Sequence, residues 1–154
     1  MNDGSSAYTE QPKLQLKATD SEDIETLSAL LQDALIGASD MAYDKKEGSF
    51  VFLANRYCWE LEGARYRCLC GVNILNVQRV RYRNMVLTED RTSINQFYNL
   101  LALSYEEAEQ TLTLMFSDGA ELACHLEAVH IIIRDVSAPH PGGRTPEHDT
   151  PEHE

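Results

Sequence analysis

Cysteines and arginines gather in one stretch of the chain, and these are the side chains whose chemistry could build a site. Residues 57–70 have the sequence YCWELEGARYRCLC, with three of the four cysteines and the only tryptophan. Cys68 and Cys70 are two residues apart, so in a strand they share one face. A zinc site usually needs about four ligands and a C-x-x-C knuckle, whereas this C-x-C has no second knuckle. We therefore interpret the cysteines as small buried hydrophobes, with metal binding or redox chemistry as the alternative. The alternation predicts a buried strand face made of Tyr66, Cys68, Cys70, Val72 and Ile74.

In this region the arginines lie on the strand face opposite to the cysteines, and they are the candidate binding residues. These residues are Arg65, Arg67, Arg79, Arg81 and Arg83. Val80 and Tyr82 separate the last three and should point inward. Like charges in a row repel one another unless acids or a partner neutralise them. Three interpretations stay open: a solvated face paired with acids of the same chain, a site for an acidic protein surface, and a site for RNA.

Motifs of catalytic and cofactor sites are missing from the sequence. His125 and Glu127 share a strand face but do not form the H-E-x-x-H pattern of a helical zinc site. The nucleophile elbow, the phosphate-binding loop and the dinucleotide-binding glycine pattern do not occur either. We therefore predict no catalytic residue, no metal ligand and no cofactor. An enzyme with an unrecognised site is kept as an alternative.

Charge is unevenly distributed along the 154 residues. The formal net charge is −12, yet residues 50–92 hold seven arginines and four acids, a local net charge of +3. The remainder carries −15, which disfavours nonspecific binding to nucleic acids or to membranes. The N-terminus lacks the pattern of a secretory signal, and no apolar run approaches the roughly 18 residues of a membrane helix. We expect a cytoplasmic protein with no membrane partner.

The elements that must position these residues point to an α+β domain. We expect residues 12–137 to fold as one domain between disordered segments at 1–11 and 138–154, because the last segment is rich in proline and has no large apolar residue. Thr19 and Glu22 fit a capping box, and an apolar face at helical spacing extends from Ile24 to Leu35, with Gly37 as the C-terminal cap.

Period-two alternation predicts strands in the rest of the domain. A short strand around Leu14 and Leu16 precedes the helix. The segments 40–44 and 49–56 form a predicted hairpin. The segments 64–72 and 74–83 are predicted as strands, either separate or joined as one long strand bent at Gly71. The remaining predicted strands are residues 97–105, 111–116 and 121–136. About seven or eight antiparallel strands with one N-terminal helix predict a curled sheet or small barrel, of a shape like a pleckstrin-homology domain.

Several short strings in a fixed order carry a resemblance to a known family. They are Leu31-Gln32-Asp33-Ala34, Asp40-Met41-Ala42-Tyr43, Asn55-Arg56-Tyr57-Cys58-Trp59-Glu60, Leu100-Leu101-Ala102-Leu103 and the Asp118-Gly119 turn. Across residues 14–136 the chain resembles the bacterial domain-of-unknown-function 2948 family. The resemblance implies kinship and carries no activity or catalytic residue.

The leading functional expectation is a small non-catalytic protein-interaction domain. Its binding face would be the arginine row, and its partner an acidic protein surface. RNA binding is the alternative that the same residues allow. The oligomeric state does not follow from the sequence.

Overall fold

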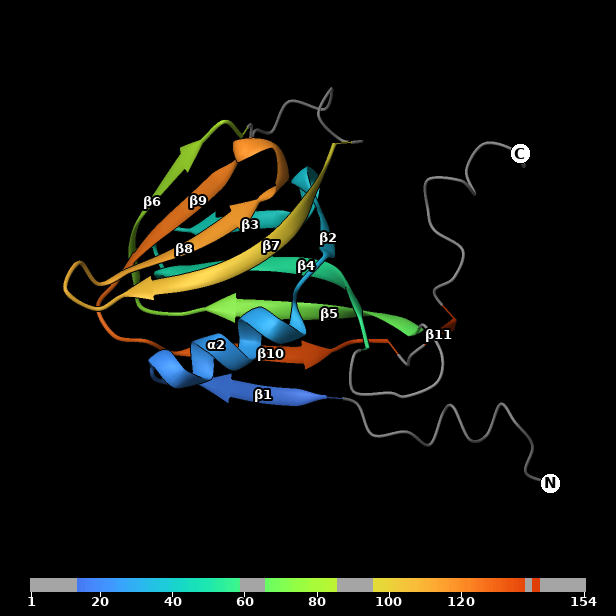
Figure 1. Ribbon diagram of the computed structural model, residues 1–154. Helices are drawn as coiled ribbons and strands as arrows, with labels where there is room; N and C mark the ends of the chain where they lie inside the picture. The colour runs from blue at the N-terminus through green and yellow to red at the C-terminus, as the bar shows by residue number, and fades with distance from the viewer. Residues whose placement is uncertain (1–13, 59–65, 86–95, 138–139, 142–154) are drawn as a thin grey trace.

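The computed structural model describes residues 14–58, 66–85, 96–137 and 140–141, and in this part of the chain one antiparallel sheet surrounds the core beside a single α-helix (Figure 1). The helix α2 is Ser21–Leu30. The strands are β1 (Gln15–Ala18), β2 (Ala34–Gly37), β3 (Met41–Asp44), β4 (Ser49–Tyr57), β5 (Tyr66–Ile74), β6 (Val77–Arg83), β7 (Phe97–Glu106), β8 (Thr111–Phe116), β9 (Glu121–Leu126), β10 (Ile131–Asp135) and β11 (His140–Pro141). The expected α+β class, mostly antiparallel sheet with one N-terminal helix, is confirmed.

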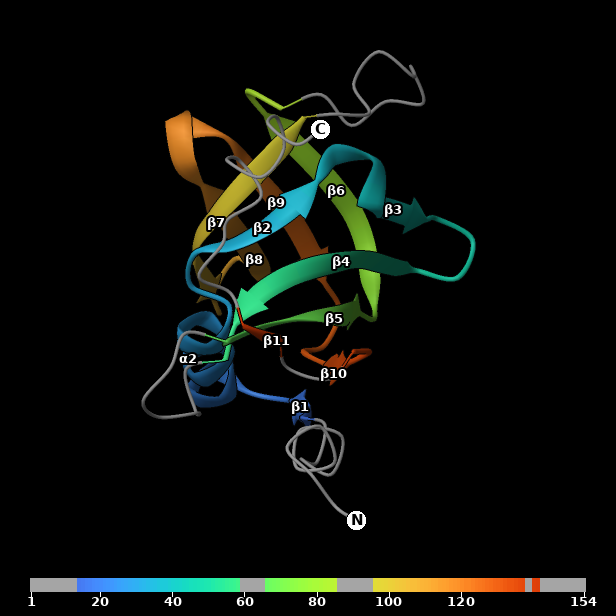
Figure 2. The same ribbon diagram turned by 90° about the vertical axis from the view of Figure 1, so that its right-hand side faces the viewer.

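The sheet is curled but open. Its strand order is β1-β10-β5-β4-β2-β7-β8-β9-β6, with β3 on β4 and β11 on β5. No pairing between described residues joins β1 to β6, so the barrel form of the prediction is wrong and the curled sheet is correct. Figure 2 shows how the strands wrap around the interior while β6 crosses the side opposite β7. The described residues form eleven strands, rather than the seven or eight predicted. The segments 64–83 and 121–136 are each divided in two, β2 takes the end of the predicted helix, and β11 lies beyond the predicted domain.

The helix begins one residue later and ends earlier than the sequence pattern indicated. Asp20 is the N-cap, and its side chain accepts a hydrogen bond from the amide of Asp23. The Asp23 carboxylate in turn accepts from the amide of Thr19 at 2.9 Å. The C-cap is Leu31, not Gly37. Asp33 has a φ of +66°, which turns the chain away from the helix and into β2.

One predicted hairpin is confirmed, whereas two other strand boundaries differ from the prediction. The β3–β4 hairpin forms as predicted, with Gly48 at a φ of +67° in its turn. The bend in the long arginine-bearing strand lies at Leu75 and Asn76, not at Gly71, where β5 keeps its pairing with both neighbours. The predicted strand 121–136 is divided into β9 and β10 by residues 127–130. These turns let one sheet curl around a core.

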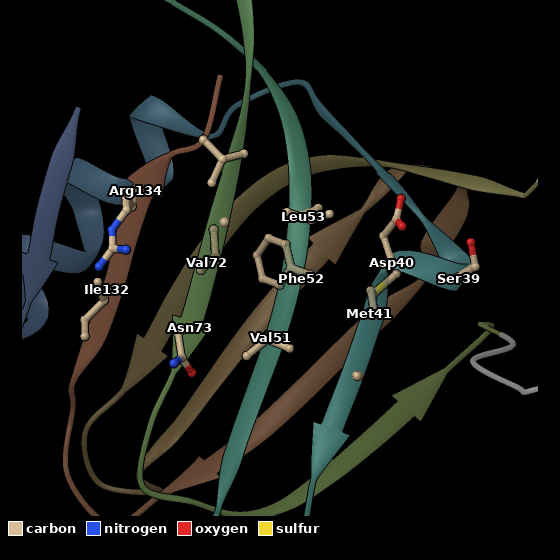
Figure 3. Close-up of a pocket in the computed structure, with 13 residues that line it drawn as sticks. Ser39, Asp40, Met41, Val51, Phe52, Leu53, Val72, Asn73, Ile132 and Arg134 are labelled. Atoms are coloured by element: carbon tan, nitrogen blue, oxygen red, sulfur yellow. The ribbon is translucent and has the colours of Figure 1, made fainter. Parts of the chain in front are cut away.

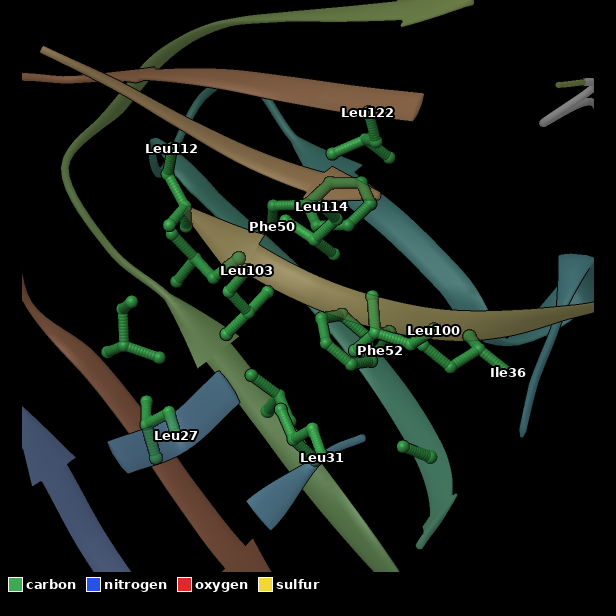
Figure 4. Packing of buried hydrophobic residues seen from close by; sticks show 14 of the residues in the cluster. Leu27, Leu31, Ile36, Phe50, Phe52, Leu100, Leu103, Leu112, Leu114 and Leu122 are labelled. Atoms are coloured by element: carbon green, nitrogen blue, oxygen red, sulfur yellow. The ribbon is translucent and has the colours of Figure 1, made fainter. Parts of the chain in front are cut away.

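Alternate side chains of the curled sheet point inward and make a single hydrophobic core (Figure 4). Phe50 of β4, Leu100 of β7 and Leu114 of β8 are fully buried there. The helix contributes Leu27, and it contacts both β1 and β7. The Leu103 amide also donates to the Ser28 hydroxyl at 2.9 Å, which attaches β7 to the helix. Burial of one set of alternate side chains therefore determines which side chains of the core-lining strands point outward.

Candidate binding surface

Three of the predicted binding residues lie together on the outer face of β6. Arg79, Arg81 and Arg83 are exposed, at alternating positions of a strand that pairs with β9. Val80, between them, contacts the core, as its parity predicted. We call Arg79, Arg81 and Arg83 the arginine row. The three arginines share one face of the sheet, because β9 holds β6 in antiparallel register from Arg79 to Arg83.

The residues facing the arginine row on β9 neutralise only one end of it. Arg83 lies opposite Glu121, and its guanidinium is 3.6 Å from that carboxylate, with the two side chains 70 % and 37 % exposed. Arg81 lies opposite Ala123 and Arg79 opposite His125. Neither Arg79 nor Arg81 makes an ion pair within the described part of the chain. The internal pairing that the sequence left open is thus limited to the Arg83 end.

Tyr82 lies on the other side of β6 from the arginines. It pairs with Leu122, which is fully buried, although the tyrosine itself stays 43 % exposed at the rim of the core. Partial burial raises the pKa of its phenol, and the nearby Cys124 and Tyr43 act in the same direction. The arginine row therefore has no aromatic side chain interleaved with it on its own strand.

Arg67 does not belong to an exposed row, and the prediction that it faces solvent is wrong. The side chain is 4 % exposed. Its Nε donates to Asn55 Oδ1 at 2.9 Å, and its Nη2 donates to the Asn55 carbonyl at 2.8 Å. The guanidinium also lies 4.0 Å from the centre of the Tyr57 ring, a cation–π contact. Arg65, its predicted neighbour, lies outside the described residues, as does Trp59.

A second arginine site was missed in the sequence: a buried ion pair between β4 and β10. Arg56 is fully buried and Asp135 is 4 % exposed. The Nε and Nη2 atoms of Arg56 donate to the two carboxylate oxygens of Asp135 at 3.1 and 3.0 Å. The sequence contains a signal for this burial, because Arg56 follows Phe52 and Ala54 at every second position. These positions of an apolar strand point inward.

Two of the buried cysteines, Cys68 and Cys70, lie close enough to this ion pair to feel the charges of Arg56 and Asp135. The Cys58 thiol donates to the Cys68 sulfur at 3.4 Å, and this bond, together with burial, raises the pKa of Cys68. Burial raises the pKa of Cys70 and of Cys124 to about 12. All four cysteines are free and buried, and the predicted inward face of Cys68 and Cys70 is confirmed. The contact between Cys58 and Cys68 was not foreseen, since it depends on the β4–β5 register.

A groove of about 560 Å³ lies on the outer face of β4 and β5 (Figure 3). Gly71 is one of its lining residues. Figure 3 shows Arg134 of β10 on one side of the groove and Ser39 and Asp40 on the other. Val51 and Leu53 of β4 expose 37 % and 38 % of their side chains there. This groove could not be predicted from the sequence, because residues of four separate strands line it.

The described residues contain neither a metal-binding cluster nor a membrane-spanning helix. No group of three or more histidine, cysteine, aspartate or glutamate side chains in that part of the chain could hold a metal ion. The helix that the structure describes is too short to cross a membrane. The arrangement therefore offers an exposed cationic row, a buried ion pair beside thiols, and an apolar groove.

Comparisons with known proteins agree with the resemblance seen in the sequence. Neither a curated protein nor a solved structure matches the chain. One family model does, and it is described as a protein of unknown function (DUF2948). Its match extends over residues 14–148, which includes every described residue. The chain belongs to the DUF2948 family.

Proposed function

We propose that this protein is a non-catalytic, cytoplasmic interaction domain whose arginine row binds an acidic surface of another protein. The observation that carries the proposal is the exposure of Arg79 and Arg81 without an acidic partner in the described structure. A chain with 25 acidic residues has many ways to place a carboxylate opposite them, yet β9 presents Ala123 and His125. Repulsion along the row would be relieved by an acidic partner.

The residue types on this surface favour protein over RNA as the partner. Recognition of single-stranded RNA usually combines cationic side chains with aromatic rings on which bases stack. Here Tyr82 points to the inner side of β6, and the outer positions of β9 are Ala123 and His125. Arginine is enriched in protein interfaces, where its planar guanidinium pairs with carboxylates in two-point contacts. A net charge of −12 also disfavours approach to a polyanion.

A capture experiment with matched charge reversals tests this proposal. The variant Arg79→Glu/Arg81→Glu changes the net charge by the same amount as Lys45→Glu/Lys46→Glu, whose lysines are exposed in the β3–β4 turn. Each tagged protein is incubated with an extract of the source cells treated with nuclease, and captured proteins are quantified by mass spectrometry. The proposal predicts at least one protein that wild type and the lysine variant retain and the arginine variant loses.

Two results would count against this function. One is an identical set of captured proteins for the wild type and both variants. The other is capture of RNA in an untreated extract, at low salt, that depends on Arg79 and Arg81 and replaces any protein signal. A circular dichroism spectrum and urea midpoint for each variant show whether the fold is retained, since all four substituted side chains lie on the surface.

A further inference from the structure

The groove on the outer face of β4 and β5 has an apolar centre. Val51 and Leu53 of β4, Leu69 of β5 and Val136, which follows β10, expose between 36 % and 47 % of their side chains. A cluster of exposed apolar side chains marks an interaction site more often than a single one does. Removal of these side chains from water by a partner would be favourable.

The two sides of the groove carry opposite charges. Arg134 of β10 lies on one side, and Asp40, which directly precedes β3, lies on the other (Figure 3). Both residues are exposed, and neither makes an ion pair within the described part of the chain. A partner for this groove must therefore present a negative charge on one side and a positive charge on the other. A uniformly acidic partner would complement Arg134 but meet Asp40 as a like charge.

One row of residues crosses the outer face between these two charges. In the sheet register Arg134 pairs with Gly71 of β5, and Gly71 pairs with Leu53 of β4. The β3–β4 register, continued by one residue, places Asp40 beside Leu53. A Cβ atom built on Gly71 would meet only the Leu53 Cδ2, at 3.9 Å, so the outer face is open above the glycine. The order along the row is thus a cation, an open space, an apolar side chain and an anion.

We propose that this groove binds the same groove of a second copy of the protein, in a dimer whose two-fold axis runs between β4 and β5 and parallel to them. Such a rotation exchanges the two ends of the row. The Arg134 guanidinium of each copy then pairs with the Asp40 carboxylate of the other copy. The same rotation places the Leu53 side chain of each copy over the open space at Gly71 of its partner.

The pattern selects a second copy because the row complements itself. Two-fold interfaces use the same patch on both subunits, so each contact is made twice and the patch must fit its own rotated image. The neighbouring row also meets this condition: its residues, in order from β10 to β3, are Ile132, Asn73, Val51 and Ala42. The rotation places Ile132 over Ala42 and Asn73 over Val51, so no charged side chain of this row is covered.

The net charge of −12 on each copy opposes self-association mainly at low salt. At physiological ionic strength, exposed charges more than about 8 Å apart are largely screened. The two pairs between Arg134 and Asp40 are contacts at close range, and screening weakens them less. The arginine row is not among the residues that line the groove, so this proposal does not depend on the proposed function.

Sedimentation equilibrium of the full-length protein tests the dimer, over protein concentrations of roughly 1–500 µM at about 0.15 M salt. We expect the wild type to shift from monomer toward dimer as its concentration rises. Arg134→Glu places two like charges together at both ends of the interface, and Asp40→Lys does the same with the opposite sign. Each variant alone should dimerise at least about tenfold more weakly. An equimolar mixture of the two should regain the association of the wild type, because opposite charges then meet at both ends.

Two further variants complete the test, with circular dichroism to show that each is folded. Gly71→Val has room for its Cβ within one chain but fills the space over which Leu53 of the second copy would lie. It should weaken the dimer at least about tenfold. Arg79→Glu, on β6, makes the same charge change as Arg134→Glu and should leave the dimer unchanged.

Three results would overturn the proposal. The first is a wild-type protein that stays monomeric at every concentration, which would leave the groove to a different occupant. The second is a dimer that Arg79→Glu weakens as much as Arg134→Glu does, which would place the interface on the arginine row. The third is a mixture of Arg134→Glu with Asp40→Lys that associates no more tightly than either variant alone. This last measurement remains decisive if Gly71→Val fails to fold.

Discussion

Substitution of one partner of the buried ion pair should destabilise this fold more than substitution of any exposed charged residue. Arg56 is fully buried, and three of its nitrogens have acceptors, two on Asp135 and one at the Tyr57 carbonyl 3.0 Å away. Asp135 also accepts from the Leu14 amide at 3.1 Å, so the pair joins β4, β10 and the start of β1. The perturbation we consider is Arg56→Met, which keeps much of the side-chain volume and leaves the Asp135 carboxylate without its cation.

The size of the effect follows from burial. An unpaired charge in a protein interior is strongly unfavourable, and loss of one partner of a buried pair typically costs about 3–5 kcal/mol. That is a large part of the roughly 5–15 kcal/mol that stabilises an ordinary domain. The Arg83–Glu121 pair is a natural reference, because it is exposed and its atoms are 3.6 Å apart. Exposed pairs contribute about 0–1 kcal/mol, so Arg83→Met should change stability by no more than that.

A double-mutant cycle distinguishes the ion pair from simple loss of side-chain packing. Urea unfolding followed by circular dichroism gives the free energy of unfolding for Arg56→Met, Asp135→Leu, the double variant and Arg83→Met. Because the double variant leaves no buried charge, it should lose less than the two single losses added together, with a coupling of about 1–3 kcal/mol. If Arg56→Met loses less than 1 kcal/mol, as Arg83→Met should, the reasoning about burial is refuted.

Two further predictions concern the interior of the sheet. Leu114→Ala should lower the free energy of unfolding by about 2–5 kcal/mol, because Leu114 is fully buried and the neighbouring strands cannot collapse onto the cavity; a loss below 1 kcal/mol in urea unfolding would contradict the packing described. Cys124 has its pKa raised from 9.0 to about 12 by burial, so the unfolded chain loses this proton at lower pH than the folded one. Stability contributed by the protonated thiol is therefore present below pH 9 and is lost as pH rises toward 12. The urea midpoint of wild type should fall over that interval more steeply than that of Cys124→Ala, and equal slopes would show that the thiol ionises freely in the folded state.

Much of the fold could be predicted from local patterns alone. The β3–β4 hairpin follows from alternation on both sides of a turn that ends in Gly48, whose positive φ suits glycine. The inward face of Cys68 and Cys70 follows from period two. The helix end did not follow, because Ala34 continues the apolar spacing of the helix although it belongs to β2. There the pairing of Ala34 with Leu100 of β7 outweighs local propensity.

The candidate site was harder to predict, because it depends on lateral neighbours. Arg67 and Arg81 both lie on outward positions of a strand, yet one is buried and the other exposed. The difference is that Tyr57 and Asn55 of β4 cover Arg67, whereas Ala123 lies beside Arg81. Alternation gives the face on which a side chain lies, but only the strand order and register give the residues that surround it there.

The most direct test of the central claim is photocrosslinking from the arginine row inside the cell. A benzoylphenylalanine in place of Ala123, beside Arg81 on the outer face of β9, reports what contacts this surface. A matched probe in place of Lys46, in the β3–β4 turn, reports background. We expect a covalent protein adduct from position 123 that Arg79→Glu/Arg81→Glu abolishes and that position 46 does not form. An adduct at position 123 that survives the charge reversal, or no protein adduct there, would contradict it.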